Sequence, residues 1–434
     1  MIINRDLYLN KLVSRKNNGM IKVITGIRRS GKSFLLFNIF KNYLITSGID
    51  KEHIIELNFD SFENEKYHDS EMAFNYLKSK ITDDGMYYML LDEIQLLDKF
   101  ESILNSFLRL SNVDIYVTGS NAKFLSKDVI TEFRGRGDQI HIFPLSFSEF
   151  YNARGIDKRD AFEEYIVYGG LPLLLSQPTY EQKVSFLKNL FVETYIKDIV
   201  NRNNIDYEDE LKELINILSS SIGSLTNPNK LTNTFKSVKN VTLSAPTISK
   251  YIEILVDSFI INRANRYDVK GKSYIDTPSK YYFSDLGLRN AAINFRQTEK
   301  THLLENVIYN ELLIRGYSVD VGIIPVVKKI NSKAVRTYYE IDFVCNKADK
   351  RIYIQSSFSL HDDAKYQQEA RSLLNVNDSF TKIIISGDAT LSHYTEDGIM
   401  IMNIFDFLLK NDSLNIWIYT TYFALSMKEA RKII

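Results

Sequence analysis

The chain has 434 residues, of which 44% are apolar and 25% charged, the composition of a folded globular protein too long for one ordinary core. Lysine plus arginine equals aspartate plus glutamate at 54 each, so the formal net charge is zero and a surface that is basic throughout is excluded. The single cysteine, Cys345, excludes an internal disulfide framework and any zinc site with several cysteines.

The first residues, 1–17, carry charges throughout and lack the apolar stretch of a secretory signal. No apolar run approaches the roughly 18 residues that a membrane-spanning helix needs. We therefore expect a cytoplasmic protein with no membrane partner.

Short β-rich apolar runs recur in the first third of the chain, at residues 20–26, 53–59, 87–93, 114–120 and 139–145. Segments with helical spacing separate several of them, at 33–43, 71–81 and 100–110. Strands that alternate with helices predict a mostly parallel sheet covered on both faces. We therefore predict a three-layer α/β domain over residues 1–165.

Beyond this domain the alternation stops and long helical patterns follow. We assign residues 166–295 to a helical and winged-helix-like segment. A third pattern starts near residue 300, with helical spacing over 302–316 and then several strands, the last at 382–387. We assign residues 296–434 to a restriction-endonuclease-like α/β domain.

The segment 26–33 reads GIRRSGKS and matches the pattern G-x-x-x-x-G-K-S between a predicted strand and a predicted helix. Two glycines allow a tight loop whose N–H groups point at phosphate oxygens. The lysine would reach the β- and γ-phosphates, the serine hydroxyl would ligate Mg²⁺, and the helix would add its positive dipole end. The sequence therefore predicts a site for ATP and Mg²⁺, formed by Gly26, Ile27, Arg28, Arg29, Ser30, Gly31, Lys32, Ser33 and Phe34.

Two acids, Asp92 and Glu93, end the predicted strand at 87–93. Asp92 would join Ser33 in holding the metal, and Glu93 would polarise the attacking water while Lys32 stabilises the transferred phosphoryl group. A solvated acidic turn is the simpler interpretation of such a pair. Its position about 60 residues after a phosphate loop favours catalysis instead.

With these motifs the chain resembles the AAA-type P-loop ATPases, and in particular a prokaryotic family with a C-terminal DUF4143-type module. The likeness is carried by the segments TGIRRSGKSFLL, LLDEIQLL, YVTGSNAKFLS, FRGRGDQIHIFPLSFSEF and YGGLP. The resemblance implies a polar sensor of the γ-phosphate at Ser120 or Asn121, with Ser120 contributing to the nucleotide site and Asn121 to catalysis. It also implies an arginine finger at Arg134 or Arg136, of which Arg136 fits the family's Gly-Arg pair better; a solvated surface loop is the alternative.

Residues 243–268 have the outline of a winged helix, with a capped helix followed by a strand. A DNA reader needs exposed cations and hydrogen-bonding side chains on such a helix. This helix offers Thr247, Ser249 and Lys250, but also Glu253 and Asp257, which would repel phosphates. Two interpretations stay open: contact with DNA, and a packing module that transmits the nucleotide state.

Residues 340–360 read as two strands joined by a polar turn. In a restriction-endonuclease-like core, Glu305, Asp342 and an acid at position 355 would bind Mg²⁺, and a lysine at 357 would orient the attacking water. This chain has Gln355 and Ser357 instead. Glu340 lies on the same strand face as Asp342 and is a further carboxylate. We expect the nuclease-like fold to persist without its catalysis.

The sequence thus predicts a Mg²⁺-dependent ATP-binding protein and ATPase that couples its nucleotide state to a conformational change, in association with DNA. One alternative is a nucleotide-dependent switch that binds protein partners or associates with itself. The other is an ATP-gated nuclease.

Overall fold

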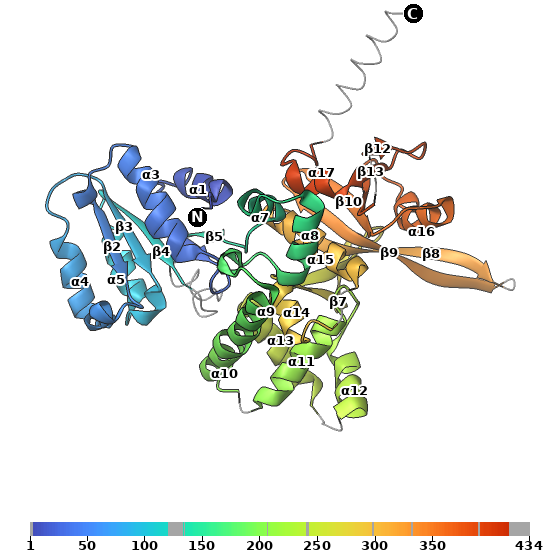
Figure 1. Cartoon of the computed structure of the whole chain (residues 1–434), viewed down its shortest axis with the longest axis horizontal. Coiled ribbons are helices and arrows are strands. Elements are labelled where there is room, and N and C mark those ends of the chain that lie inside the picture. The colour runs from blue at the N-terminus through green and yellow to red at the C-terminus, as the bar shows by residue number, and fades with distance from the viewer. Residues whose placement is uncertain are drawn as a thin grey trace, which may run out of the picture.

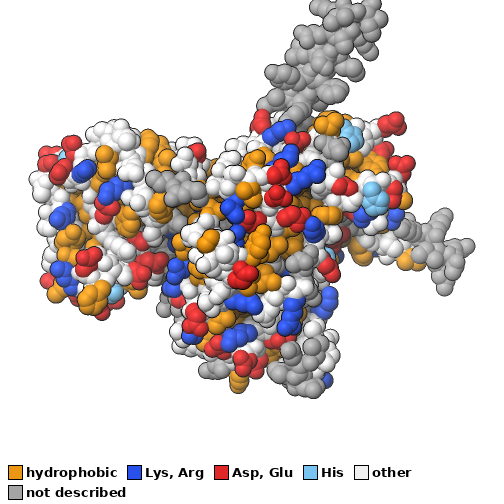
Figure 2. All heavy atoms as spheres, in the orientation of Figure 1, with side chains coloured by type: hydrophobic (Ala, Val, Ile, Leu, Met, Phe, Trp, Pro, Cys, Tyr) orange, Lys and Arg blue, Asp and Glu red, His pale blue; other side chains and the backbone are white. Residues whose placement is uncertain are grey.

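The computed structural model describes residues 3–119, 133, 135–205, 207–239, 243–296, 299–330, 333–388 and 391–415. These residues form a five-stranded and an eight-stranded β-sheet, each accompanied by helices (Figure 1). Figure 2 shows acidic and basic side chains interspersed over the visible face, in keeping with the net charge of zero. None of the described helices is long and apolar enough to cross a bilayer.

The N-terminal sheet is entirely parallel, as the alternating sequence pattern predicted. Its strands are β1 (Ile21–Thr25), β2 (Ile54–Asn58), β3 (Tyr87–Asp92), β4 (Val113–Thr118) and β5 (Gly137–His141), in the spatial order β2-β3-β4-β1-β5. Strands β1, β3 and β4 are buried along their whole length, because a parallel sheet packs helices on both faces.

Two apolar clusters lie on opposite faces of this sheet. On β3, Tyr88 and Leu90 join the first cluster, and Met89 and Leu91 join the second. The first cluster packs α1 (Asp6–Val13) and a continuous helical segment made of α2 (Lys32–Phe34), η1 (Leu35–Phe40) and α3 (Lys41–Thr46). The second packs α4 (Ser70–Ser79) and α5 (Phe100–Phe107). This part of the chain is therefore a three-layer α/β arrangement.

Two helices at the predicted boundary of residue 165 pack away from the first sheet. Helix α7 (Phe147–Arg154) starts at a capping box in which Ser146 and Glu149 bond each other's backbone, and α8 (Lys158–Tyr168) follows. Phe147, Phe150 and Ile166 belong to the largest apolar cluster, which continues through the rest of the chain. The division at residue 165 stays a prediction, and these two helices share their core with the later segments.

A helical segment follows, which is mostly α-helical but starts with the 3₁₀ helix η6 and contains the π-helix η7. It contains η6 (Pro172–Ser176), α9 (Tyr180–Asn189), η7 (Leu190–Ile196), α10 (Lys197–Asn203), α11 (Glu208–Ser220), α12 (Pro228–Lys239) and α13 (Ala245–Asp257). Ser244 caps α13 by accepting a hydrogen bond from the N–H of Thr247. The hairpin of β6 (Ile261–Asp268) and β7 (Ser273–Phe283) comes next, before α14 (Leu286–Ala292). The winged-helix assignment stays a prediction for this helix–hairpin order.

The second sheet has mixed strand directions and crosses the predicted boundary at 295. Its order is β12-β13-β11-β10-β9-β8-β6-β7, so the β6–β7 hairpin forms one edge, with β6 parallel to β8. The later elements are α15 (Lys300–Ile314), β8 (Ser318–Ile330), β9 (Lys333–Lys347), β10 (Lys350–Ser357), α16 (Asp363–Leu374), β11 (Thr381–Ser386), β12 (His393–Tyr394), β13 (Met400–Asn403) and α17 (Ile404–Leu409). Strands β8, β9 and β10 are antiparallel neighbours, and β11 runs parallel to β10.

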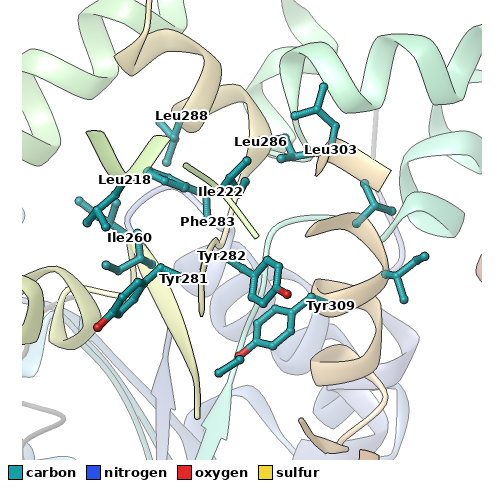
Figure 3. Packing of buried hydrophobic residues seen from close by; sticks show 14 of the residues in the cluster. Leu218, Ile222, Ile260, Tyr281, Tyr282, Phe283, Leu286, Leu288, Leu303 and Tyr309 are labelled. Carbon is teal, nitrogen blue, oxygen red and sulfur yellow. The ribbon is translucent and has the colours of Figure 1, made fainter. Parts of the chain in front are cut away.

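The largest core cluster binds these parts together where β7 meets α14 and α15 (Figure 3). Tyr282 of β7 stacks on Tyr309 of α15 with ring centroids 4.1 Å apart. Ile222 and Leu218 at the end of α11 pack in the same region. The helical segment and the second sheet therefore share one continuous hydrophobic core.

Candidate nucleotide site

The C-terminal ends of β1, β3 and β4 lie together at one end of the strands of the five-stranded sheet. Strand β4 lies between β1 and β3, although it follows both in sequence. The phosphate loop leaves β1, Thr118 ends the neighbouring strand β4, and Asp92 ends β3, the next strand in the sheet. Open parallel sheets bind ligands at this edge, where strand order reverses.

The phosphate loop has a backbone that requires glycine at its first position. Gly26 has φ 144°, and a Cβ there would lie 2.2 Å from the carbonyl oxygen of Ile142. Gly31 has φ 96° and starts the helix at Lys32. Arg29, between them, also has a positive φ of 61°. The loop therefore adopts the tight turn that the motif predicts.

Lys32 lies inside this loop. Its side chain is only 5% exposed, and Nζ donates hydrogen bonds of 3.0 Å to the carbonyl oxygens of Gly26 and Ile27. The ammonium is thus held at the centre of the loop, where a phosphate oxygen would meet both its charge and the loop's N–H groups.

Ser33, Asp92 and Thr118 form one hydrogen-bonded group beside Lys32. The hydroxyl of Thr118 donates to the Asp92 carboxylate, and the Ser33 side chain also bonds Asp92. Burial raises the pKa of Asp92, while the hydrogen bonds from Thr118 and Ser33 act in the opposite direction. A hydroxyl and a carboxylate in contact are oxygen ligands that Mg²⁺ prefers, so this donor set fits the predicted metal.

Glu93 follows Asp92 with an unusual backbone. Its φ of 53° is left-handed, and its N–H donates to the Thr118 hydroxyl over 3.1 Å. Its carboxylate accepts a hydrogen bond from the side chain of Gln95. Thr118 therefore fixes both acids at once, the side chain of Asp92 and the backbone of Glu93.

A cleft of about 960 Å³ opens at this edge of the sheet, and both halves of the molecule line it. From the first half come polar and charged residues of the loop and β3, together with Phe34: Arg28, Arg29, Lys32, Ser33 and Glu93. From the helical segment come Pro172, Leu173, Leu175 and Thr194. An apolar wall next to a phosphate loop suits a ligand with a flat base at one end and phosphates at the other.

Two direct bonds join the phosphate loop to the helical segment. The Tyr195 hydroxyl, on η7, donates to the backbone carbonyl of Arg28 over 2.6 Å. The Arg28 guanidinium pairs with Asp198 of α10 over 3.1 Å. The position of the loop is therefore tied to the position of η7 and α10.

A third contact reaches the loop from the N-terminus. Arg5 is 5% exposed, and its guanidinium donates to the carbonyl oxygens of Ser30 over 3.1 Å and Phe143 over 2.7 Å. It also pairs with Glu149 of α7 over 3.0 Å. Arg5 thus holds the phosphate loop against the start of the second half of the chain.

The structure separates Arg136 from this site. Arg136 is exposed and directly precedes β5, and its carbonyl accepts from the N–H of Ile21 at the start of β1. Because β1 and β5 are parallel, Arg136 lies at the N-terminal end of the strands, whereas the phosphate loop lies at their C-terminal end. The two are separated by the length of a five-residue strand, roughly 15 Å. Arg136 is therefore not among the residues that the structure brings to the phosphate loop. Ser120, Asn121 and Arg134 lie outside the described residues.

Sequence reasoning missed several residues that shape the cleft, namely Arg5, Thr118, Pro172, Tyr195 and Asp198. Thr118 carried a usable signal, since it is a polar residue at the end of an apolar strand and adjacent to the expected sensor. Pro172 belongs to the YGGLP segment, whereas Arg5, Tyr195 and Asp198 have no local signature, because their role depends on contacts between segments far apart in sequence.

The carboxylates of the terminal domain also meet. Glu305, Glu340 and Asp342 all contact the ammonium of Lys280, a residue of β7. Gln355 accepts a weak bond of 3.4 Å from the Asp342 N–H, and the Ser357 hydroxyl donates to the carbonyl of Ser359. The predicted common face of Glu340 and Asp342 is confirmed. Within the described residues, no group of three or more metal-ligating side chains is arranged to hold an ion.

Two segments of the chain match known families. Residues 18–151 match the AAA domain family. Residues 159–299 match a domain of unknown function, DUF8612, and not the DUF4143-type module that the resemblance had led us to expect.

Two archaeal solved structures resemble the fold at low similarity. The Aeropyrum pernix ORC2 protein in ADPNP–ADP complexes has a TM-score of 0.35 at 13% identity, covering 71% of this chain and 92% of that one. The Aeropyrum pernix ORC1 protein in complex with DNA has a TM-score of 0.27 at 13% identity, covering 68% and 93%. TM-scores this low do not support a closer assignment.

Relatives of nearly full length exist in a bacterium and an archaeon. An uncharacterised protein of Methanocaldococcus jannaschii is 28% identical over 417 residues, 91% of this chain and 88% of that protein. An uncharacterised protein of Haemophilus influenzae is 37% identical over 420 residues, 94% of this chain and 99% of that protein. The chain therefore belongs to the same family as the Haemophilus influenzae protein, and its first part is an AAA-type P-loop domain.

Proposed function

We propose that this protein binds ATP with Mg²⁺ in the cleft at the phosphate loop, hydrolyses it, and transmits the nucleotide state to the helical segment. The observation that carries the proposal is the group formed by Lys32, Ser33, Asp92 and Thr118 at adjacent carboxyl ends of parallel strands. An ammonium for phosphates, a hydroxyl and a carboxylate for the metal, and a neighbouring acid are the parts that phosphoryl transfer needs.

Each side chain has a separate role in this proposal. Lys32 binds the β- and γ-phosphates and offsets the charge of the transferred phosphoryl group, and Ser33 and Asp92 would hold Mg²⁺. The metal supplies charge neutralisation at the phosphates when it is bound. Glu93 accepts a hydrogen bond from the attacking water and orients it, once its carboxylate leaves Gln95. The apolar side chains of Phe34, Leu173 and Leu175 exclude water around the base.

Coupling is proposed because the helical segment forms one wall of the cleft and bonds the phosphate loop directly. Tyr195 and Asp198 both contact Arg28, which lies four residues before Lys32. A phosphate that enters the loop reorients its backbone, and these contacts carry the change to η7 and α10.

The test is a comparison of wild type with Lys32→Ala and Glu93→Gln. Wild type should bind ATP and release phosphate in the presence of Mg²⁺. Lys32→Ala should lose binding, and Glu93→Gln should keep binding while hydrolysis falls by about 10²–10⁴-fold. Wild-type protein that neither binds nor hydrolyses ATP would overturn the proposal.

Association with DNA is a second candidate, supported by the exposed turn of the β6–β7 hairpin. Lys270 and Lys272 are exposed there, and Lys250 is exposed on α13. Arg263, by contrast, is neutralised by an ion pair with Glu253. Duplex DNA that raises ATP turnover in wild type, with the effect lost in Lys270→Glu/Lys272→Glu and at high salt, would support DNA as the partner. Unchanged turnover would favour the alternative, a nucleotide-dependent switch that binds protein partners or a second copy of this chain.

A further inference from the structure

The second sheet contains a buried cluster of three carboxylates and one ammonium. Lys280 Nζ lies 2.8 Å from Glu305 Oε1, 2.8 Å from Glu340 Oε1 and 3.4 Å from Asp342 Oδ1. The Lys280 side chain is 3% exposed, and those of Glu305 and Asp342 are 9% exposed. Only Glu340, at 34%, reaches the surface.

The ammonium is matched to this set of oxygens. An ammonium group has three N–H donors and no acceptor, and here three carboxylates surround it. The carboxylates also accept hydrogen bonds from neutral donors. The Tyr282 hydroxyl donates to Glu305 over 2.6 Å, and the N–H and hydroxyl of Ser356 donate to Asp342 over 2.9 and 3.1 Å. Lys280 is therefore the cation that the structure gives to these three acids.

The four residues come from parts of the chain that sequence reasoning assigned to different domains. Glu305 lies on α15, and Glu340 and Asp342 lie on β9, as a nuclease-like metal site would require. Lys280 and Tyr282 both come from β7, and the ring of Tyr282 stacks on that of Tyr309 (Figure 3). Gly223, after α11, covers Glu305 so closely that a Cβ would lie 2.9 Å from its carboxylate.

We infer that the ammonium of Lys280 permanently occupies the position of a divalent cation in this carboxylate cluster, so that the second sheet works without a metal and does not cleave nucleic acid. Three observations carry this inference together. The ammonium contacts all three acids, Gly223 after α11 covers the carboxylate of Glu305, and Ser357 supplies no second ammonium at the position where metal-dependent cleavage would need one. The inference goes beyond the nucleotide site and is independent of it.

Charge balance makes the inference testable by substitution. Lys280→Met keeps the length and apolar stem of the side chain and removes its charge. Three carboxylates would then face one another without a cation, and a divalent ion that prefers oxygen ligands becomes the natural replacement. The variant should gain a metal site that wild type does not have.

The experiment uses the full chain, free of nucleotide, titrated with MnCl₂ by calorimetry and followed by thermal unfolding. Lys280→Met should bind one more Mn²⁺ per chain than wild type, and its unfolding midpoint should rise by several degrees when Mn²⁺ reaches about 100 times its dissociation constant. Adding Glu305→Gln to Lys280→Met should abolish both effects.

A second comparison tests the inference without any variant at Lys280. If Lys280 fills the site, the Mn²⁺ isotherm of wild type should not change in Asp342→Asn. Loss of a bound Mn²⁺ in Asp342→Asn would overturn the inference, as would plasmid cleavage by wild type with Mg²⁺ that disappears in Asp342→Asn or Lys280→Met. Folded Lys280→Met that takes up no additional Mn²⁺ would also contradict it.

Discussion

The phenol of Tyr195 donates a hydrogen bond of 2.6 Å to the backbone carbonyl of Arg28, across 167 residues of sequence. One partner is in the phosphate loop and the other is on the π-helical turn η7 of the helical segment. Because the acceptor is a backbone carbonyl, the bond depends on the backbone conformation of the loop and not on the side chain of Arg28. It links the phosphate loop of the nucleotide cleft directly to the helical segment.

Tyr195→Phe removes this bond and leaves the ring. We expect the free energy of unfolding to fall by about 1 kcal/mol, the typical net value of one buried hydrogen bond. We also expect ATP to protect residues 190–203 less well against hydrogen exchange than in wild type. Tyr180→Phe is the matched control, because Tyr180 is 67% exposed. Equal protection in both variants would show that the loop and η7 respond to nucleotide independently.

Thr118→Val removes the hydroxyl that bonds the Asp92 carboxylate and the Glu93 N–H. The side chain keeps its shape, so the loss comes from the Asp92 carboxylate and the Glu93 N–H, which each give up one hydrogen bond worth about 1 kcal/mol, while Asp92 keeps its bond from Ser33. We expect ATP turnover to fall at least tenfold, because the metal ligand and the catalytic acid both lose their support. Thr118→Ser keeps the hydroxyl and should retain most activity in the same phosphate-release measurement.

Arg5→Lys tests the N-terminal contact with the phosphate loop. A lysine cannot reproduce the planar set of bonds to Ser30, Phe143 and Glu149. We expect the dissociation constant for ATP to rise about tenfold, with a lower unfolding temperature. Arg15→Lys is the control, since Arg15 pairs with Asp138 at the surface of the same half of the chain. ATP affinity that is equal in the two variants would remove Arg5 from the site.

His141 makes the free energy of unfolding depend on pH. Burial lowers the pKa of His141 to about 3, with Lys32 and Lys11 adding in the same direction. The unfolded chain takes up this proton near pH 6.5 and the folded chain does not, so the contribution is complete above pH 6.5 and is lost as the pH falls towards 3. Denaturant unfolding between pH 7 and 4 should therefore show a shallower loss of stability in His141→Gln than in wild type.

The matched control for this titration is His393→Gln, because His393 is exposed. Its slope against pH should equal that of wild type. Burial raises the pKa of Asp285 to about 6 and that of Glu305 to about 7, and these groups change stability in the opposite sense as the pH falls. The difference between His141→Gln and wild type isolates the histidine, since both carboxyls are present in each protein.

The first sheet was predictable because its signals are local. Short apolar strands alternate with helical spacing from residue 20 to residue 145, and the result is the parallel sheet that this pattern favours. The phosphate loop was equally legible, since Gly26 has a conformation and a close contact that only glycine tolerates. The acids at 92 and 93 stand next to the loop because parallel strands end at one edge.

The sequence does not reveal the spatial order of the strands or the contacts between segments that are far apart in the chain. The insertion of β4 between β1 and β3 brings Thr118 to Asp92, and no local pattern reveals a spatial order. The resemblance implied an arginine finger at Arg134 or Arg136, and the register of β5 with β1 places Arg136 at the end of the strands away from the phosphate loop. The role of Lys280 was not predicted, because a lysine in a hairpin strand is expected to be exposed to solvent unless acidic residues are known to surround it.

The position of β6 and β7 at the edge of the second sheet limits where the chain can be cut to make shorter fragments. A cut between α14 and α15, where the sequence suggests a domain boundary, would leave the later fragment with β8 as a bare edge and with Glu305, Glu340 and Asp342 stripped of their cation. Such a fragment invites aggregation through its open strand and mutual repulsion at its centre. The helical segment and the second sheet are therefore better kept together, because they share one hydrophobic core and one buried charge cluster.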